Sequence, residues 1–388
     1  WIRLLRTVLN GTDVPISADD RVLVDNGRLL SALSHLVVTM SADMLDQLAL
    51  WFLQLHADLR PAPPSDQAER FLACHAGVEL RYGLVLVAEY TASQSNKRRR
   101  HHIAALANDV RDHMVTVIRG DPQLPREART KLAAKIENLT MVLFPSGRLN
   151  DAWLTQLYDA FPEQAPSYVH FWLAAAQAQR SLLIGASVPS GTSGDDDRLW
   201  FLNAARDLPA EYDYWNNRLV LRPAALQAPL YYAHASNAIV YAGLGATLAR
   251  LMARAFDERG IEVSSDGQLG GGWLSAAARQ HLDQRMAACW EPALEATITA
   301  YAAAALKSRS DTGLRLDRVY SPMQLFFLSF CHPLCGLPAI TTEGHGPKPP
   351  RERLCNQALM NTRHFSSAFG CHVGEHPMAP ASICGETD

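Results

Sequence analysis

Apolar side chains recur at the 3.6-residue spacing of an α-helix through much of the first half of the chain. The spacing is clear in three runs between residues 31 and 182, marked by Leu45, Leu48, Trp51, Phe52 and Leu55, by Leu80, Leu84 and Val87, and by Ile103, Leu106, Val110, Met114 and Val117. Helices with one apolar face must bury that face against a neighbour. The pattern therefore predicts a mainly α fold with little sheet.

Length and charge exclude several classes of protein. With 388 residues, 48% apolar and 19% charged, the chain is long enough for two or three globular domains. Its net charge of −3 argues against a nucleic-acid partner. We find no run of about 18 apolar residues, so no membrane span is expected within the chain. Residue 1 is Trp and no signal peptide follows, so we interpret the sequence as a fragment or a processed ectodomain.

A Ser-, Gly- and Asp-rich loop at 187–197 is the best internal boundary. We expect one domain over 1–205 and a second over 206–388. In the second, 217–221 is a candidate strand, whereas 237–259 and 282–305 follow the helical pattern. Pro and Gly are frequent after 336, which predicts little regular structure there.

Residues 96–102, Asn-Lys-Arg-Arg-Arg-His-His, form a basic cluster. A solvated helix start explains such a run, and a surface for a polyanion is the alternative.

Cysteines and sequons indicate the compartment. Of seven cysteines, five fall in the last 60 residues, and none forms a CxxC pair. Asn10 and Asn138 each begin an N-glycosylation sequon. Together these features favour an oxidising, extracellular location, either secreted or as the ectodomain of a single-pass membrane protein.

Several sequence blocks, in order, resemble the neprilysin and endothelin-converting-enzyme family of zinc metalloendopeptidases. Residues 321–330, SPMQLFFLSF, are similar to its TPxQLFFLSF. Residues 266–273 resemble DxDGxLxxWW, and 128–132 keep AxxKL. Around 359–371 the sequence resembles LxNxxxFxxAFxC.

The resemblance implies a two-lobed ectodomain fragment with a helical N-terminal lobe, a thermolysin-like C-terminal lobe and a short β element. It also implies a disulfide between Cys289 and Cys384, and bonds from Cys74, Cys335 and Cys371 to cysteines upstream. Cys331 and Cys355 have no family counterpart, and whether they pair with each other stays open.

Within this frame, Arg250-Leu-Met-Ala-Arg254 stands where the family has HExxH. Two His at i and i+4 share a helix face and ligate Zn²⁺, and the Glu activates the bound water. Arginine has no free lone pair, and Leu251 cannot take a proton. Loss of a general base alone removes roughly 10²–10⁴ in rate.

Other family positions have also changed. Glu291 would be the third ligand and Glu295 the carboxylate that orients the first His, although two surface carboxylates explain both equally. His345 fits the transition-state His. The substrate-carboxylate Arg is Arg351 or Arg353.

The substrate-backbone pair Asn-Ala maps onto Pro209-Ala210, where proline cannot donate a backbone hydrogen bond. No metal is expected, since only Glu291 matches a family ligand.

The two arginines have two possible sets of ion-pair partners. Arg250 and Arg254 either form ion pairs with Glu291 and Glu295 in place of zinc, or Arg254 pairs locally with Asp257 or Glu258.

A second metal motif occurs near the C-terminal end. His372-Val-Gly-Glu-His376 has the letters of an inverted zinc motif, but Gly374 and Pro377 favour a chance match in a loop.

The sequence leaves it uncertain whether the protein is an enzyme. The favoured function is an inactive pseudopeptidase, without cofactor, that binds a peptide or protein ligand in the cleft between lobes. The alternatives are an active endopeptidase holding zinc through atypical ligands, and a structural or decoy ectodomain without ligand.

Overall fold

The computed structural model describes residues 17, 27–56, 66–94, 96–144, 151–186, 209–265, 267, 273–287, 292–308, 314–315, 319–335 and 351–383. The chain forms two compact units, the first made of 1–89 with 145–206 and the second of 90–144 with 207–388. The division expected between 205 and 206 did not anticipate that 90–144 joins the second unit. The physical reason is that helices from this segment pack against helices after residue 245.

The first unit is helical, as the periodicity predicts. It contains α2 (Gly27–Thr39), α3 (Ala42–His56), most of α4 (Gln67–Gln94), α7 (Asp151–Tyr158) and α8 (Tyr168–Ala186). Tyr82, where α4 is kinked, stacks on Tyr158 with ring centroids 5.4 Å apart. The expected apolar stripe of α3 is largely exposed within this unit, for Trp51 and Phe52 are 57% and 53% accessible.

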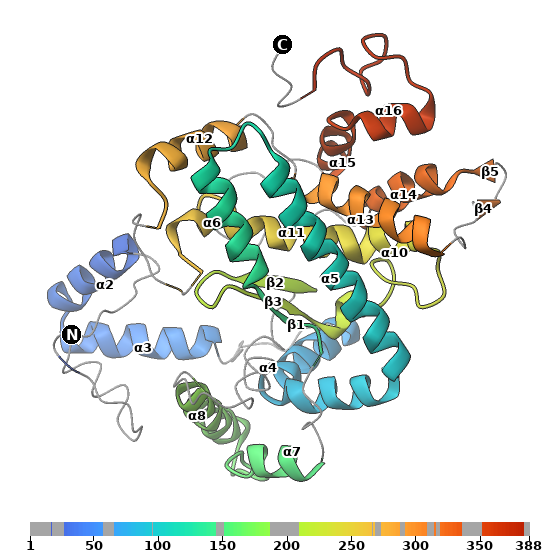
Figure 1. Cartoon of the computed structure of the whole chain (residues 1–388). Coiled ribbons are helices and arrows are strands. Elements are labelled where there is room, and N and C mark those ends of the chain that lie inside the picture. The colour runs from blue at the N-terminus through green and yellow to red at the C-terminus, as the bar shows by residue number, and fades with distance from the viewer. Residues whose placement is uncertain are drawn as a thin grey trace. The chain divides into compact units, whose positions relative to one another are not determined.

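The second unit contains the main hydrophobic core (Figure 1). Its helices are α5 (Lys97–Gly120), α6 (Arg126–Glu137), α10 (Asn237–Val240), α11 (Ala246–Ala253), α12 (Ala276–Ala287), α13 (Pro292–Ser308), α14 (Pro322–Cys331), α15 (Arg351–Met360) and α16 (Arg363–Phe369). The face of α5 predicted from periodicity is confirmed, since Ile103, Leu106, Val110 and Met114 are buried. The tail contains more helix than its composition suggested, because α15 and α16 pack their apolar sides onto α14.

A three-stranded sheet, in the order β1-β3-β2, lies within this unit. β1 (Thr140–Val142) pairs in parallel with β3 (Arg218–Leu221), and β2 (Ala210–Asp213) pairs antiparallel with β3. The strand predicted at 217–221 is therefore confirmed as β3. A small antiparallel ribbon joins β4 (Leu314–Arg315) to β5 (Val319–Tyr320).

A disulfide joins Cys331, at the end of α14, to Cys355 in α15. This bond answers the pairing that the sequence left open. Cys74, Cys335 and Cys371 are free thiols in this structure. Cys289 and Cys384, whose pairing the family resemblance implies, lie outside the described residues.

The helical run Asn237–Phe256 is long and apolar enough to cross a membrane by length and composition alone. However, 72% of its most apolar window is buried inside the fold. Burial of this kind is typical of the core helix of a globular domain.

Candidate functional site

α11 carries Arg250 and Leu251, and Arg254 follows it directly; the family resemblance places these three residues at the zinc motif. The helical run containing it begins with α10, passes through a π-helical segment, Tyr241–Gly245, and ends in a 3₁₀ turn, Arg254–Phe256. Gly243 is required in this run, because a Cβ there would lie 2.3 Å from the carbonyl oxygen of Leu230. The backbone of residue 230 thus packs directly on the helix and fixes its position.

The helix over 237–259, expected from its periodicity, has one apolar and one polar side. The apolar side is buried in the core and consists of Leu244, Leu248, Leu251, Met252 and Ala255. The polar side is partly open, since Thr247, Arg250 and Asp257 are half-buried and Arg254 is exposed. Leu251, at the position of the family's general base, therefore points into the core and not toward solvent.

Arg250 contacts an aromatic ring, and Arg254 lies near another. The guanidinium carbon of Arg250 lies 5.4 Å from the ring centre of Phe330, on α14. Arg254 lies near Tyr214, where burial and a hydrogen bond to Asp257 raise the pKa of the hydroxyl and the charges of Arg254 and Arg259 oppose that rise. A guanidinium over a ring face is a favourable cation–π arrangement.

The ion pairs expected for these arginines would involve Glu291 and Glu295. Glu295, on α13, lies 3.9 Å from Nε2 of His364, and among the described residues it forms no ion pair with Arg250 or Arg254. A link between α11 and Glu291 stays a prediction. Glu291 and His345 lie outside the described residues. Arg351 and Arg353 lie in the first turn of α15, and their side chains are not described.

The local alternative, a pair of Arg254 with Asp257 or Glu258, is not among the ion pairs of the described residues either. Asp257 accepts a hydrogen bond from the hydroxyl of Tyr214 at 2.7 Å. Its other oxygen accepts from the backbone N–H groups of Arg259 at 3.1 Å and Gly260 at 2.8 Å. Asp257 thus closes the turn that follows α11.

A buried cation holds the same turn, and the sequence analysis missed it. Lys135, on α6, is 0% exposed, and its Nζ donates to the carbonyl oxygens of Gly260 at 2.7 Å and Val263 at 2.6 Å. The ammonium also lies 5.2 Å from the ring centre of Trp273. Burial lowers the pKa of Lys135 to about 8, and the charge of Asp257 partly offsets this effect. Helical spacing from the buried Leu132 could have revealed a lysine on the apolar face of α6.

β2 presents a backbone edge to the region of α11. Among the described residues no strand pairs with the outer side of β2, and α11 packs on that side of the sheet (Figure 1). The N–H of Arg222 donates to the carbonyl oxygen of Pro209 at 3.0 Å. Pro209 and Arg222 are therefore a hydrogen-bonded pair of the ladder. Hydrogen-bonded and non-hydrogen-bonded pairs alternate along antiparallel strands, so the next pair, Ala210 opposite Leu221, is a non-hydrogen-bonded one. The N–H and C=O groups of Ala210 and Tyr212 therefore point away from β3.

This register changes the meaning of Pro209. From the sequence alone, a proline here is expected to remove a donor to an extended peptide. In the structure the backbone of Pro209 faces β3, so the missing N–H is lost from the inner side of the ladder. The outward-facing donor and acceptor belong to Ala210 and are retained.

A metal centre is not evident in the part of the chain that the structure describes. No group of three or more His, Cys, Asp and Glu side chains there is arranged to hold a metal ion. His372 and His376 lie in a turn with Gly374 at φ +85°, so they do not share a helix face. Arg250, Leu251 and Arg254 supply no lone pair for zinc. The described residues therefore do not fit the zinc ion that the family resemblance implies.

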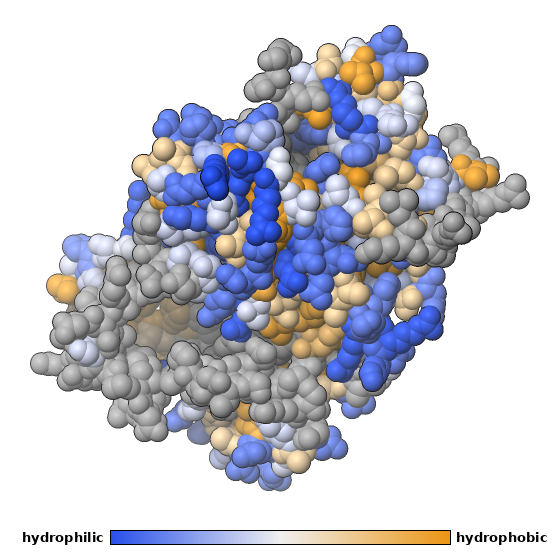
Figure 2. All heavy atoms as spheres, in the orientation of Figure 1, coloured by the Kyte–Doolittle hydropathy of each residue, from blue (hydrophilic) through white to orange (hydrophobic). Residues whose placement is uncertain are grey.

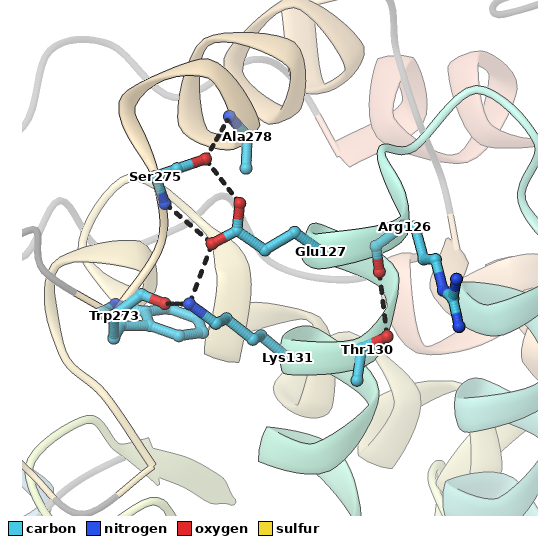
Figure 3. Close-up of polar contacts among 7 residues, drawn as sticks. All are labelled: Arg126, Glu127, Thr130, Lys131, Trp273, Ser275 and Ala278. Carbon is cyan, nitrogen blue, oxygen red and sulfur yellow. Dashed lines mark hydrogen bonds and ion pairs between the residues drawn. The ribbon is translucent and has the colours of Figure 1, made fainter.

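A polar network connects α6 to the start of α12 (Figure 3). Ser275 donates to Glu127 through its hydroxyl at 2.6 Å and its backbone N–H at 3.1 Å. Lys131 donates to the same carboxylate at 2.9 Å and to the carbonyl oxygen of Trp273. The Ser275 hydroxyl also accepts from the N–H of Ala278 and so caps α12. These hydrogen bonds, led by those from Ser275, lower the pKa of Glu127 to about 2.

This lowered pKa predicts a pH-dependent contribution to stability. The pKa of Glu127 is about 2 when folded and near 4.5 when unfolded. The contribution is therefore fully present above pH 4.5 and is lost as pH falls through 2. We expect Glu127→Gln to lower the melting temperature at pH 7 and to have a progressively smaller effect at pH 4 and pH 3. A difference that is constant over this range would mean that the carboxylate charge contributes nothing.

Comparison with known proteins supports the resemblance to a peptidase family. The model of peptidase family M13 matches residues 210–291, which include β2, β3 and α11. The chain is also similar to mouse membrane metallo-endopeptidase-like 1, 21% identical over 99% of this chain and 56% of that protein. Rat endothelin-converting enzyme 1 is 27% identical over 45% of this chain and 26% of its own.

Solved M13 structures share the fold. The zinc metalloprotease Zmp1 of Mycobacterium tuberculosis, in complex with an inhibitor, aligns with a TM-score of 0.58 at 17% identity, over 76% of this chain and 48% of that one. The expected fold class is confirmed. The chain spans about half the length of the mouse relative that it matches over nearly all its residues.

Proposed function

We propose that this protein is a member of peptidase family M13 that binds extended peptides without hydrolysing them. The observation that carries the proposal is the edge of β2 that no described strand pairs with, beside a helix that bears Arg250, Leu251 and Arg254 at the positions of the family's zinc motif. Without two ligands and the general base, the site lacks both the Lewis acid and the proton acceptor of zinc-dependent hydrolysis. The peptide-binding elements do not depend on those groups.

The binding mode follows from the register of β2. A peptide in extended conformation can add to an open strand edge, because its backbone groups pair with those that face outward. Here these are the N–H and C=O of Ala210 and Tyr212. The arginines of the neighbouring helix supply positive charge for a peptide carboxylate or a polarised carbonyl, with Arg254 the more exposed of the two.

The location that we propose is extracellular. The Cys331–Cys355 disulfide supports an oxidising compartment. The sequon at Asn138 supports it too, because both Asn138, which ends α6, and Thr140 are exposed. The sequon at Asn10 lies outside the described residues.

Zinc analysis and calorimetry test the proposal together. We expect purified protein to contain far less than one zinc per chain and to leave a pool of fluorogenic oligopeptides intact. The same pool, immobilised, should retain the protein. A retained decapeptide should lose at least about tenfold in affinity when alternate amide nitrogens are methylated, since each lost backbone hydrogen bond costs roughly 1 kcal/mol.

Three outcomes would contradict the proposal. Stoichiometric zinc with hydrolysis blocked by phosphoramidon would show an active peptidase with atypical ligands. An absence of retained peptide would favour a structural or decoy ectodomain. Equal binding of parent and N-methylated peptides would exclude pairing with β2.

A further inference from the structure

The basic cluster at the start of α5 is a surface that the proposed function does not use. It consists of Lys97, Arg98, Arg99, Arg100, His101 and His102, all within the first two turns of a helix that begins at Lys97. At a rise of about 1.5 Å per residue these six side chains occupy roughly 8 Å of helix axis. Figure 2 shows strongly hydrophilic atoms gathered at this end of α5.

Aromatic rings hold the inner members of the cluster in place. The guanidinium of Arg99 lies 5.1 Å from the ring centre of Tyr231 and donates to the carbonyl oxygen of Leu226. Arg100 lies 5.5 Å from the ring centre of Phe144. These contacts restrict the side chains before any ligand arrives, and so reduce the entropy that binding must cost.

The outer lysine and arginine carry charge without a counter-charge among the described residues. Lys97, Arg98 and His101 are exposed, and no carboxylate of the described residues forms an ion pair with any of them. The first turn of α5 contains no acidic residue. Its free N–H groups add positive potential at the same place, where acidic side chains are normally the stabilising ones. An external anion would relieve this repulsion.

The shape of the cluster favours a ligand that presents charge alone. Peptide partners usually bind through apolar anchors that enter pockets. Here Arg99 and Arg100 already lie over the faces of Tyr231 and Phe144, so these rings are not offered as such anchors. The disulfide and the exposed Asn138 sequon favour a compartment in which sulfated glycans, and not nucleic acids, are the abundant polyanions.

We propose that this cluster binds a sulfated glycan chain. The exposed side chains of Lys97, Arg98 and His101 contact its sulfates. Arg99 and Arg100, held over aromatic rings, add fixed positive charge beneath them. Binding of this kind is electrostatic, so its affinity falls steeply as salt is added. The proposal does not depend on peptide binding at β2.

Calorimetry with a heparin-derived dodecasaccharide tests this inference. The variant Lys97→Glu with Arg98→Glu should bind at least about tenfold more weakly than the parent at 100 mM NaCl, with a smaller dependence on salt. Lys97→Gln with Arg98→Gln should give an intermediate loss. Because Lys97 and Arg98 are exposed, neither double variant should disturb the fold, and thermal melting checks this.

The matched control reverses two exposed arginines elsewhere. Arg28→Glu with Arg126→Glu gives the same change in net charge and should stay within about twofold of the parent. The inference is overturned if the control loses as much affinity as the cluster variant, or if the parent does not bind. Equal binding of a desulfated dodecasaccharide, or tighter binding of single-stranded DNA or a polyglutamate peptide, would also overturn it.

Discussion

Replacing Lys135 with Met should lower the free energy of unfolding by about 3 kcal/mol. Met preserves the length and apolar stem of the side chain, so the change removes little packing. It leaves the carbonyl oxygens of Gly260 and Val263 without their buried donor, and each such loss costs roughly 1–3 kcal/mol. The contact with Trp273 is also lost. The variant no longer has to bury a charged ammonium, and the desolvation cost that it avoids offsets part of these losses. We therefore expect a net effect of about 3 kcal/mol.

The matched control lies one turn away on the same helix. Lys131→Met removes an equivalent ammonium whose side chain is 42% exposed and whose ion pair with Glu127 is on the surface. Surface pairs contribute about 0–1 kcal/mol, so this variant should stay within that range. Urea unfolding of both variants beside the parent measures the difference. Equal losses would show that burial of Lys135 has no special consequence.

The Lys135 contribution also has a defined dependence on pH. Its pKa is lowered to about 8 in the fold, against 10.5 when unfolded. Between these values the unfolded chain binds more protons, so the stability of the parent relative to Lys135→Met should rise with pH. Below pH 8 the difference should be constant. Tyrosine ionisation acts on both proteins and cancels in the comparison. A gap that narrows between pH 8 and pH 10 would contradict this assignment.

Local features of the fold followed from the sequence. Helical periodicity identified the buried face of α5 and the helix over 237–259, and the stretch at 217–221 was identified as the strand that is β3. These features depend on neighbours within one or two turns. Lys135 and Gly260 are 125 residues apart, and nothing in local spacing joins them. The same limit explains why the assignment of 90–144 to the second unit was not predicted.

At the candidate site, the contacts between helices could not be predicted from the sequence. The family resemblance singled out Arg250 and Arg254, which lie on the polar side of their helix. It could not predict their partners, because a pair across two helices depends on how each helix is rotated. The guanidinium of Arg250 lies over the ring of Phe330, and the carboxylate of Glu295 lies near the imidazole of His364. For Pro209, the register between β2 and β3 determines whether its missing N–H would face β3 or the outer edge. That register depends on a strand elsewhere in the chain and cannot be read from the residues around Pro209.

Removing the Cys331–Cys355 disulfide should cost about 3 kcal/mol of unfolding free energy. The bond closes a segment with a sequence separation of 24, and the entropy that such a cross-link removes from the unfolded chain corresponds to roughly 3 kcal/mol. The double variant Cys331→Ala with Cys355→Ala should unfold at correspondingly lower denaturant. Reductant should shift the parent to the same midpoint and leave the double variant almost unchanged.

Cys335 provides the control for this experiment, because its thiol lies one helical turn from Cys331 and 3.6 Å from the carbonyl oxygen of that residue. If Cys331 pairs with Cys355, Cys335→Ala keeps the full effect of reductant. If Cys335 is instead the partner of either cysteine, Cys335→Ala alone should reproduce the destabilisation and abolish the response. The second result would contradict the observed pairing. The first would show that a cross-link without a family counterpart ties α14, which contacts Arg250 through Phe330, to α15, the helix that begins at Arg351.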